Sequence, residues 1–210
     1  MRKHVKKTLK SAWALWGNLS LGTILLILGL SAAGSIYGLR SNNLTMIDLR
    51  NEVILADKDD GDIEQALRDL RAHVNSHMNT DLSRDLGGVS GVEQPIQLIY
   101  SFYRASIDEY QKLVVDSAEN TTILNDAIAA CTSVQITERL NCINTEVETV
   151  DDSNFPALAP LPKDLFVHDF HSPRWTPDLA GISIVFFALS ILLLATRFVV
   201  GYMVGRATRS

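Results

Sequence analysis

Two long uncharged runs divide the chain into five segments. Residues 19–39 and 179–196 contain no charged side chain. The first run has 21 residues, and a helix of that length is about 31 Å long, enough to cross a hydrocarbon core about 30 Å thick. The apolar pattern resumes after Arg197, whose guanidinium can reach the lipid headgroups from the end of a span. We therefore expect transmembrane helices at residues 19–39 and 179–200.

Between the two runs, apolar residues recur with helical spacing. They continue from the first run to an acidic turn at residues 56–62, where Gly61 suits a reversal of the chain. A stripe at positions i, i+3, i+4 and i+7 then extends from Ile63 to Met78, and a shorter stripe covers residues 136–150. Such spacing is typical of amphipathic helices that pack on one another. The acidic turn is interpreted as solvated rather than as a calcium loop, because the glutamate that such a loop needs at its twelfth position is missing.

A register of 3.5 residues runs from Pro95 to Cys131 and predicts a long third helix packed at shallow angles. Pro95 suits the first turn of this helix, where proline is tolerated. Ser117 and Thr121 put polar residues into its apolar seam. The helix therefore either breaks near these residues or tolerates a polar layer, and we favour the second interpretation.

Five of the six prolines lie in residues 156–177, which indicates an extended return segment rather than a long helix. The predicted fold class is therefore all-α. It consists of two transmembrane helices that flank an extracytoplasmic antiparallel helical bundle with a Pro-rich extended return segment.

Charge decides the expected orientation of the spans. All 24 acidic residues lie in residues 40–178 together with 11 basic residues, which gives this segment a formal charge of −13. Residues 1–18 carry five Lys or Arg, residues 197–210 carry three, and neither end contains an acid. Under the positive-inside rule the protein is a two-span cell-membrane protein, with residues 1–18 and 201–210 cytoplasmic and residues 40–178 outside. The negative charge of that domain argues against nucleic acid as a partner.

Aromatic residues and an arginine at the ends of the spans are expected to anchor them in the bilayer: Trp13, Trp16, Trp175 and Arg197. A signal peptide cleaved near Ser31–Ala33 is the main alternative, but the apolar run is longer than the usual signal-peptide core.

Two pairs of glycines have the same spacing, with three residues between the members of each pair: Gly34 with Gly38 in the first apolar run, and Gly201 with Gly205 after the second. Small residues at this spacing let two helices approach closely in lipid. Glycine is also common in membrane helices without such a role, and we favour this simpler interpretation.

The two cysteines, Cys131 and Cys142, are predicted to form a disulfide because a domain outside the membrane meets an oxidising compartment. The bridge would centre a turn between two helices near Ile136–Thr137, with Thr137 as the N-cap. Two free thiols are the alternative. The spacing matches no zinc motif.

Four histidines could together hold a metal ion: His73, His77, His168 and His171. The first two are related as i and i+4, the spacing at which two imidazoles on one helix can share a zinc or copper ion. The helix lacks the glutamate of a metalloprotease motif, so we favour ordinary core or surface histidines and expect no cofactor. No Ser/His/Asp motif, P-loop or dinucleotide fingerprint is present, and we expect a protein without enzymatic activity.

A possible binding surface combines a glycine-rich loop, residues 79–94, with a row of tyrosines. Its candidate residues are Gly87, Gly88, Gly91, Tyr100, Tyr103 and Tyr110. Long loops are often functional, and tyrosine is common in interfaces. Tyrosines in a heptad register more often belong to the core, and that interpretation is the stronger one.

The order of these segments resembles the extracytoplasmic four-helix sensor modules of bacterial chemoreceptors and histidine kinases. The resemblance is one of architecture and covers residues 1–200. It implies a sensing or interaction module. Such receptors continue into an output domain, whereas only the short segment 198–210 follows Arg197 here, so we expect an accessory subunit whose membrane-protein partner, or a second copy, supplies the output. A structural envelope protein is the alternative, and a metal-binding domain a minor one.

Overall fold

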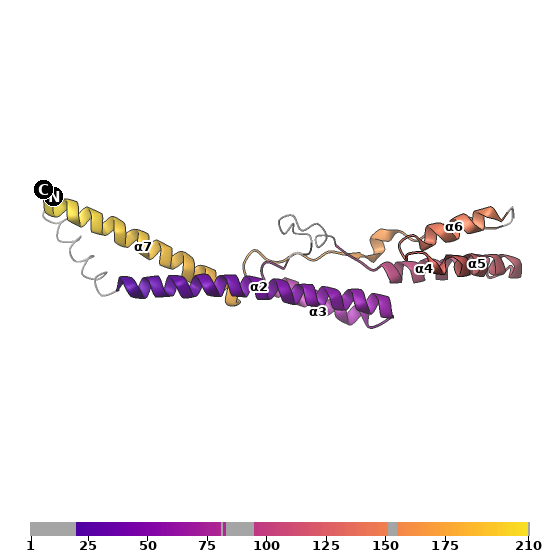
Figure 1. The fold of residues 1–210 in the computed structure, drawn as a ribbon, viewed down its shortest axis with the longest axis horizontal. Coiled ribbons are helices and arrows are strands. Elements are labelled where there is room, and N and C mark those ends of the chain that lie inside the picture. The colour runs from indigo at the N-terminus through magenta and orange to yellow at the C-terminus, as the bar shows by residue number, and fades with distance from the viewer. Residues whose placement is uncertain (1–19, 81, 83–94, 151–154, 210) are drawn as a thin grey trace. The chain divides into compact units, whose positions relative to one another are not determined.

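The chain is mostly helical, which confirms the predicted all-α class at the level of secondary structure. The computed structural model describes residues 20–80, 82, 95–150 and 155–209 (Figure 1). The helices and strands in these residues are α2 (Leu21–Asp59), α3 (Ile63–Ser76), β1 (Ile96–Gln97), α4 (Ile99–Val114), α5 (Ala118–Ala130), η1 (Cys131–Ser133), α6 (Arg139–Thr149), η2 (Lys163–Phe166), β2 (Val167–His168) and α7 (Leu179–Arg209).

Two of the helices, α2 and α7, are long and apolar enough to cross a membrane. The chain forms two compact units. The first contains residues up to Thr45, Val74–Thr80 and the residues from Ser172 onward. The second contains Met46–His73 and Asp81–His171.

In the first unit, α2 and α7 touch through small residues. A Cβ added to Gly38 would lie 2.7 Å from the backbone nitrogen of Ala180, and one added to Gly34 would lie 2.6 Å from Oγ of Ser183. At Gly38 the neighbouring atoms are backbone, so this approach requires glycine there, whereas at Gly34 the nearest atom is a serine hydroxyl oxygen that can rotate away. Our preference for an incidental pair of glycines is therefore wrong for Gly34 and Gly38.

A polar junction closes this helix pair just beyond Gly38. The side-chain nitrogen of Asn42 donates to a carboxylate oxygen of Asp178 at 2.6 Å and to the carbonyl oxygen of Met78 at 3.3 Å. The amide of Met78 donates in turn to Oγ1 of Thr176 at 3.1 Å. The junction therefore ties α2, the chain after α3, and the start of α7 together.

The carboxylate of Asp178 is the centre of the junction. Partial burial acts to raise the pKa of Asp178, but other groups outweigh it and hold this pKa below the ordinary value of 3.8: the amide of Gly181, the side chains of Asn42 and Thr176, and the charge of His77. Each of these groups favours the ionised carboxylate.

Acidification is therefore expected to weaken the junction. The pKa is lower in the folded chain than in the unfolded chain, so the contribution is fully present above about pH 4 and is lost as the pH falls through the folded-state pKa. Thermal unfolding of the full chain in detergent micelles between pH 2.5 and 7 would measure the loss. Asp178→Asn should remove this part of the pH dependence, whereas Asp164→Asn, at an exposed acid, should retain it.

The turn between α2 and α3 lies where the sequence predicts it. Helix α2 continues without a break into the acidic turn, as predicted, and the amide of Gly61 donates to the carbonyl oxygen of Ala56 at 2.8 Å. The left-handed residue is Asp60, with φ of 57°, rather than Gly61. Asp62 then caps α3 through a 2.9 Å bond from the amide of Gln65.

The predicted long third helix is wrong, because the chain breaks at the polar residues in its seam. Pro95 precedes the short strand β1 rather than a helix, and α4 ends at Val114. Ser117 caps α5 by accepting a hydrogen bond from the amide of Asn120 at 3.2 Å. A serine at an N-cap stabilises a new helix start, which explains the break.

Helix α5 runs back along α4 rather than continuing it. The guanidinium of Arg139, at the start of α6, lies 5.7 Å from the centroid of the Tyr103 ring near the start of α4. The end of α5 is therefore close to the start of α4, which requires a reversal at residues 115–117. The three helices share one core, made of Tyr110, Val114, Leu124, Ala127, Cys131, Leu140, Ile143 and Val147.

The Pro-rich segment is extended, as predicted, apart from the short helix η2. Strand β2 pairs with β1 in antiparallel register, with Ile96 opposite His168 and Gln97 opposite Val167. Phe155 and Leu158 pack against the three-helix core. The return segment is therefore fixed both by apolar contacts and by backbone hydrogen bonds.

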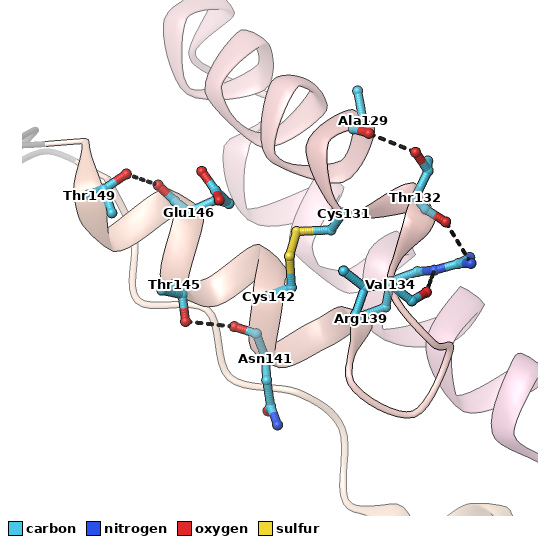
Figure 2. The surroundings of a disulfide bond; sticks show 10 residues. All are labelled: Ala129, Cys131, Thr132, Val134, Arg139, Asn141, Cys142, Thr145, Glu146 and Thr149. Atoms are coloured by element: carbon cyan, nitrogen blue, oxygen red, sulfur yellow. Dashed lines mark hydrogen bonds between the residues drawn. A yellow bond between two sulfur atoms is a disulfide. The ribbon is translucent and has the colours of Figure 1, made fainter.

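The predicted disulfide between Cys131 and Cys142 is formed, with a Cα–Cα distance of 5.9 Å (Figure 2). The turn between α5 and α6 lies where the cysteine spacing placed it, but Thr137 is not the N-cap, since Glu138 holds that position without a side-chain hydrogen bond. Arg139 closes the turn instead, donating to the carbonyl oxygens of Val134 at 3.0 Å and Thr132 at 2.9 Å.

Loss of the disulfide is expected to lower the free energy of unfolding of the second unit by about 3 kcal/mol, because the bridge restricts the unfolded chain. The Cys131→Ser/Cys142→Ser variant of the full chain should show this loss in denaturant unfolding followed by circular dichroism. A reducing agent should have the same effect on the wild type and none on the variant. Equal stability of both proteins in oxidising buffer would contradict the prediction.

Candidate functional site

A cleft of about 320 Å³ lies in the second unit, where three segments that are distant in sequence meet. Strand β1 and the start of α4 form one wall, the α5–α6 connection another, and η2 with β2 a third. The lining residues are Gln97, Leu98, Ile99, Phe102, Ile136, Thr137, Lys163, Asp164, Phe166 and Val167. The volume falls at the lower end of the range of small-molecule sites.

Contacts from the return segment hold the walls of the cleft in place. The amide of Leu98 donates to the carbonyl oxygen of Phe166 at 2.9 Å. The rings of Phe102 and Phe166 meet edge to face, with centroids 5.6 Å apart and planes at 67°. Edge-to-face aromatic pairs are favourable beyond the area they bury, so these two rings form a firm apolar wall.

Two adjacent charges of opposite sign stand at the mouth of this largely apolar cleft. Lys163 and Asp164 are both exposed, and Nζ of Lys163 lies 5.8 Å from the centroid of the Phe102 ring. A cation at this distance is attracted to the face of an aromatic ring. The arrangement is suited to a small molecule with an apolar body and a polar or charged end.

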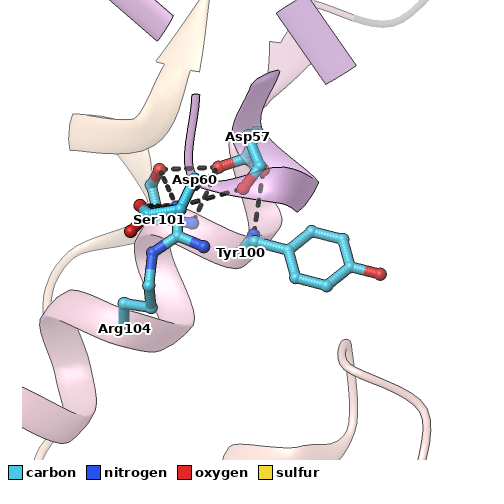
Figure 3. Close-up of polar contacts among 5 residues, drawn as sticks. All are labelled: Asp57, Asp60, Tyr100, Ser101 and Arg104. Atoms are coloured by element: carbon cyan, nitrogen blue, oxygen red, sulfur yellow. Dashed lines mark hydrogen bonds and ion pairs between the residues drawn. The ribbon is translucent and has the colours of Figure 1, made fainter. Parts of the chain in front are cut away.

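A buried carboxylate on α2 positions the start of α4 and therefore one wall of the cleft (Figure 3). Asp57 is 3% exposed. Its two carboxylate oxygens accept hydrogen bonds from the amides of Tyr100 and Ser101 at 2.9 and 2.8 Å and from the hydroxyl of Ser101 at 2.6 Å. Leu98, the N-cap residue of α4, provides no side-chain hydrogen bond. Asp57 therefore acts as the N-cap of α4 from another helix.

Arg104 completes this cluster from the next turn of α4. Its Nη2 donates to the carbonyl oxygen of Asp57 at 3.0 Å and lies 3.3 Å from a carboxylate oxygen of Asp60. A cation near the last carbonyls of a helix is favourable, so Arg104 stabilises the end of α2 while Asp57 stabilises the start of α4.

Asp57 is not among the residues predicted from the sequence, because the acidic turn is interpreted there as solvated. A signal was nevertheless present. Met46, Val53 and Asp57 follow one another at steps of i+7 and i+4, and all three are buried. An acid that continues the apolar stripe of a helix must be partnered when it is buried, and this rule would have separated Asp57 from its exposed neighbours.

The tyrosine row does not form one binding surface. Tyr110 is fully buried in the core, which excludes it from any surface, whereas Tyr100 and Tyr103 are half-buried. Burial raises the pKa of the Tyr110 phenol and the Asn144 side chain acts in the opposite direction. Neither the hydroxyl of Tyr110 nor Oδ1 of Asn144 has a hydrogen-bond partner of standard geometry among the described residues. The glycines of the proposed surface, Gly87, Gly88 and Gly91, lie outside the described residues.

The four histidines are not gathered around a metal site. Within the described part of the chain, no group of three or more His, Cys, Asp or Glu side chains could hold a metal ion. His77 belongs to the first unit and His73, His168 and His171 to the second. His168 pairs with Ile96 in the short sheet, and Nε2 of His171 lies 3.7 Å from a carboxylate oxygen of Asp169.

Of the expected anchoring residues, Trp13 and Trp16 lie outside the described residues. Trp175 is 52% exposed and donates from Nε1 to the carbonyl oxygen of Gly181 at 3.3 Å. A Cβ at Gly181 would collide with the carbonyl oxygen of Thr176, so this turn at the start of α7 requires glycine. Arg197 lies on α7 and is half-buried.

Comparison with protein-family models, with curated proteins and with solved structures gives no match for this chain. Function is therefore inferred from the residues and their geometry.

Proposed function

We propose that this chain is a non-enzymatic integral membrane protein whose acidic domain, residues 40–178, is a sensing or interaction module on the outer side of the membrane. The cleft between β1, α4, the α5–α6 connection and η2 carries the proposal. Six of its ten lining residues are apolar and the other four are polar or charged, a mixed lining of the kind that small-molecule sites have.

Two further observations support this role. Helices α2 and α7 have the length and composition of membrane spans. Every acidic residue lies in residues 40–178, between the two uncharged runs, and the charged residues of the two ends are all basic, which fits an outer domain and cytoplasmic termini. The strongly negative domain would repel polyanions, so the ligand is a small amphipathic molecule rather than a nucleic acid or an acidic polymer.

The cleft is connected to α2 through its capping carboxylate. Asp57, near the end of α2, bonds to the first amides of α4, and α4 contributes Ile99 and Phe102 to the cleft. A ligand that shifts the start of α4 would therefore change the contacts of α2. In this proposal the chain is an accessory subunit, and a membrane-protein partner or a second copy converts that change into an output.

A thermal-shift screen of the full chain in detergent tests the cleft. The probes are amino acids, small carboxylic acids, quaternary amines and aromatic acids. Ile136→Trp fills the cleft from a half-buried lining position, whereas Val115→Trp adds the same ring at a position that is 69% exposed and does not line it.

A compound that stabilises the wild type and Val115→Trp but not Ile136→Trp would support the proposal. The proposal fails if every stabilising compound acts equally on all three proteins, or if no compound stabilises any of them. Cross-linking in native membranes would then distinguish the alternative: self-assembly without another membrane protein favours a structural role in the cell envelope.

A further inference from the structure

A second hollow lies in the first unit, far along both long helices from the place where they touch. It has a volume of about 380 Å³ and is lined by Leu21, at the start of α2, and by Arg197, Phe198, Gly201 and Tyr202, in the last part of α7. We call these five residues the wedge. No residue of the cleft takes part in it.

The wedge exists because the two helices separate away from their contact. Gly34 and Gly38 are in close contact with α7, whereas the hollow opens more than three helical turns away from Gly34, at Leu21. Figure 1 shows the same divergence. The first residues of α7 lie near α2, and the two helices move apart toward the chain termini. In the proposed membrane topology, this opening is where a lipid would enter between the two helices.

Both sides of the wedge lie at the same depth. Leu21 precedes Gly38 in the sequence by the same number of positions as Arg197 follows Ala180, and Gly38 and Ala180 are in contact. At about 1.5 Å rise per residue, each side is about 26 Å from the contact. That distance is close to the thickness of the hydrocarbon core, which puts Arg197 at the opposite headgroup level and Tyr202 roughly one and a half helical turns beyond it.

The chemistry of the wedge suits a lipid phosphate. Phe198 and Tyr202 are each 69% exposed and offer apolar surface to acyl chains and a hydroxyl to the headgroup. The guanidinium of Arg197 has five N–H donors in a planar fork that matches phosphate oxygens. Arg197 takes part in an interaction within the chain, and a group with five donors can serve a second acceptor as well.

Charge favours an anionic lipid over a zwitterionic one. The ends of the chain on this side of the spans carry eight Lys or Arg and no Asp or Glu. Basic residues next to a span attract anionic headgroups, by roughly a factor of five for each residue near the surface. We propose that the wedge binds the phosphate of one anionic phospholipid, with Arg197 as the phosphate ligand, Phe198 beside its acyl chains and the hydroxyl of Tyr202 beside its headgroup.

The inference depends on the proposed membrane topology, and native mass spectrometry of the full chain in detergent tests it. Phosphatidylglycerol and phosphatidylcholine with identical acyl chains are titrated separately, and the occupancy of the first bound lipid is compared. The wild type is expected to bind the first phosphatidylglycerol at least several-fold more tightly. Arg197→Gln should reduce this preference by at least about five-fold, while Arg206→Gln, at an exposed arginine on the same helix that does not line the wedge, should reduce it less.

Other outcomes would overturn the inference. Equal binding of the two lipids by the wild type is one, and an equal loss of preference in Arg206→Gln and Arg197→Gln is another. The third is displacement of the lipid by millimolar inorganic phosphate, which would identify a site for the free ion. Carbonate extraction of the same membranes separates this failure from that of the topology. A chain that is extracted refutes the spans, whereas a chain that is retained but shows no lipid preference refutes only the wedge.

Discussion

Replacement of Asp57 by alanine is expected to destabilise the second unit by about 2–4 kcal/mol. The substitution removes a buried carboxylate and leaves three donors, the amides of Tyr100 and Ser101 and the hydroxyl of Ser101, without their acceptor. Unsatisfied buried donors cost about 1–3 kcal/mol each, and part of this cost is recovered when the start of α4 unwinds toward water. Arg104 also loses one of its two acidic neighbours.

Two measurements would check this prediction in the full chain. Thermal unfolding should shift to a lower temperature, and the amides of Tyr100 and Ser101 should exchange hydrogen faster, because they lose a partner that is specific to them. Asp59→Ala is the matched control, since Asp59 belongs to the same acidic turn but is exposed. The stability of Asp57→Asn should lie between those of Asp57→Ala and Asp59→Ala, because the asparagine amide keeps one acceptor oxygen. Equal stability of Asp57→Ala and Asp59→Ala would show that the cap is not needed.

Replacement of Gly38 by leucine is expected to separate α2 from α7. A Cβ at this position would lie 2.7 Å from the backbone nitrogen and 2.8 Å from Cα of Ala180, and backbone atoms cannot rotate away as a flexible side chain can. Overpacking of this kind costs typically about 1–3 kcal/mol, and more where backbone must move. The junction between Asn42 and Asp178 lies one helical turn beyond Gly38 and should be lost with the helix contact.

Gly29→Leu provides a control on the same helix, because a Cβ there meets no described atom within 4 Å. The midpoint of thermal unfolding in detergent micelles should fall for Gly38→Leu and stay near the wild-type value for Gly29→Leu. Gly38→Leu should also lose the acid-sensitive part of the stability that Asp178 provides, since Asn42 would no longer lie beside the Asp178 carboxylate. Identical melting of the two leucine variants would refute the small-residue contact.

The long register of the predicted third helix shows how a correct pattern can give a wrong element. The apolar residues of α4 and α5 keep one heptad register although the chain reverses between them. The reason is that Val114 and Leu124 face the same core from two antiparallel helices. The register reports which residues are buried, and it does not report whether the helix that carries them is continuous. Ser117 carried the local signal for the break.

The glycine pairs show a different limit. Gly34 with Gly38 and Gly201 with Gly205 have the same spacing in equally apolar surroundings, and no local rule separates them. The first pair contacts α7, and the contact depends on the small residues Ala180 and Ser183 lying opposite. A helix interface needs two complementary surfaces, so one sequence motif cannot establish it.

The sequence by itself determined the properties that depend on neighbouring residues: the helical class, two runs long enough to span a bilayer, the continuation of the first of them to the acidic turn, and the extended Pro-rich segment. It also predicted the disulfide, because the two cysteines of the chain allow only one pairing. Only the tertiary structure decided the cleft, the cap by Asp57 and the contact at Gly38. Each of these joins segments that are distant in the sequence, and which distant surfaces meet depends on the packing of the whole unit rather than on local spacing.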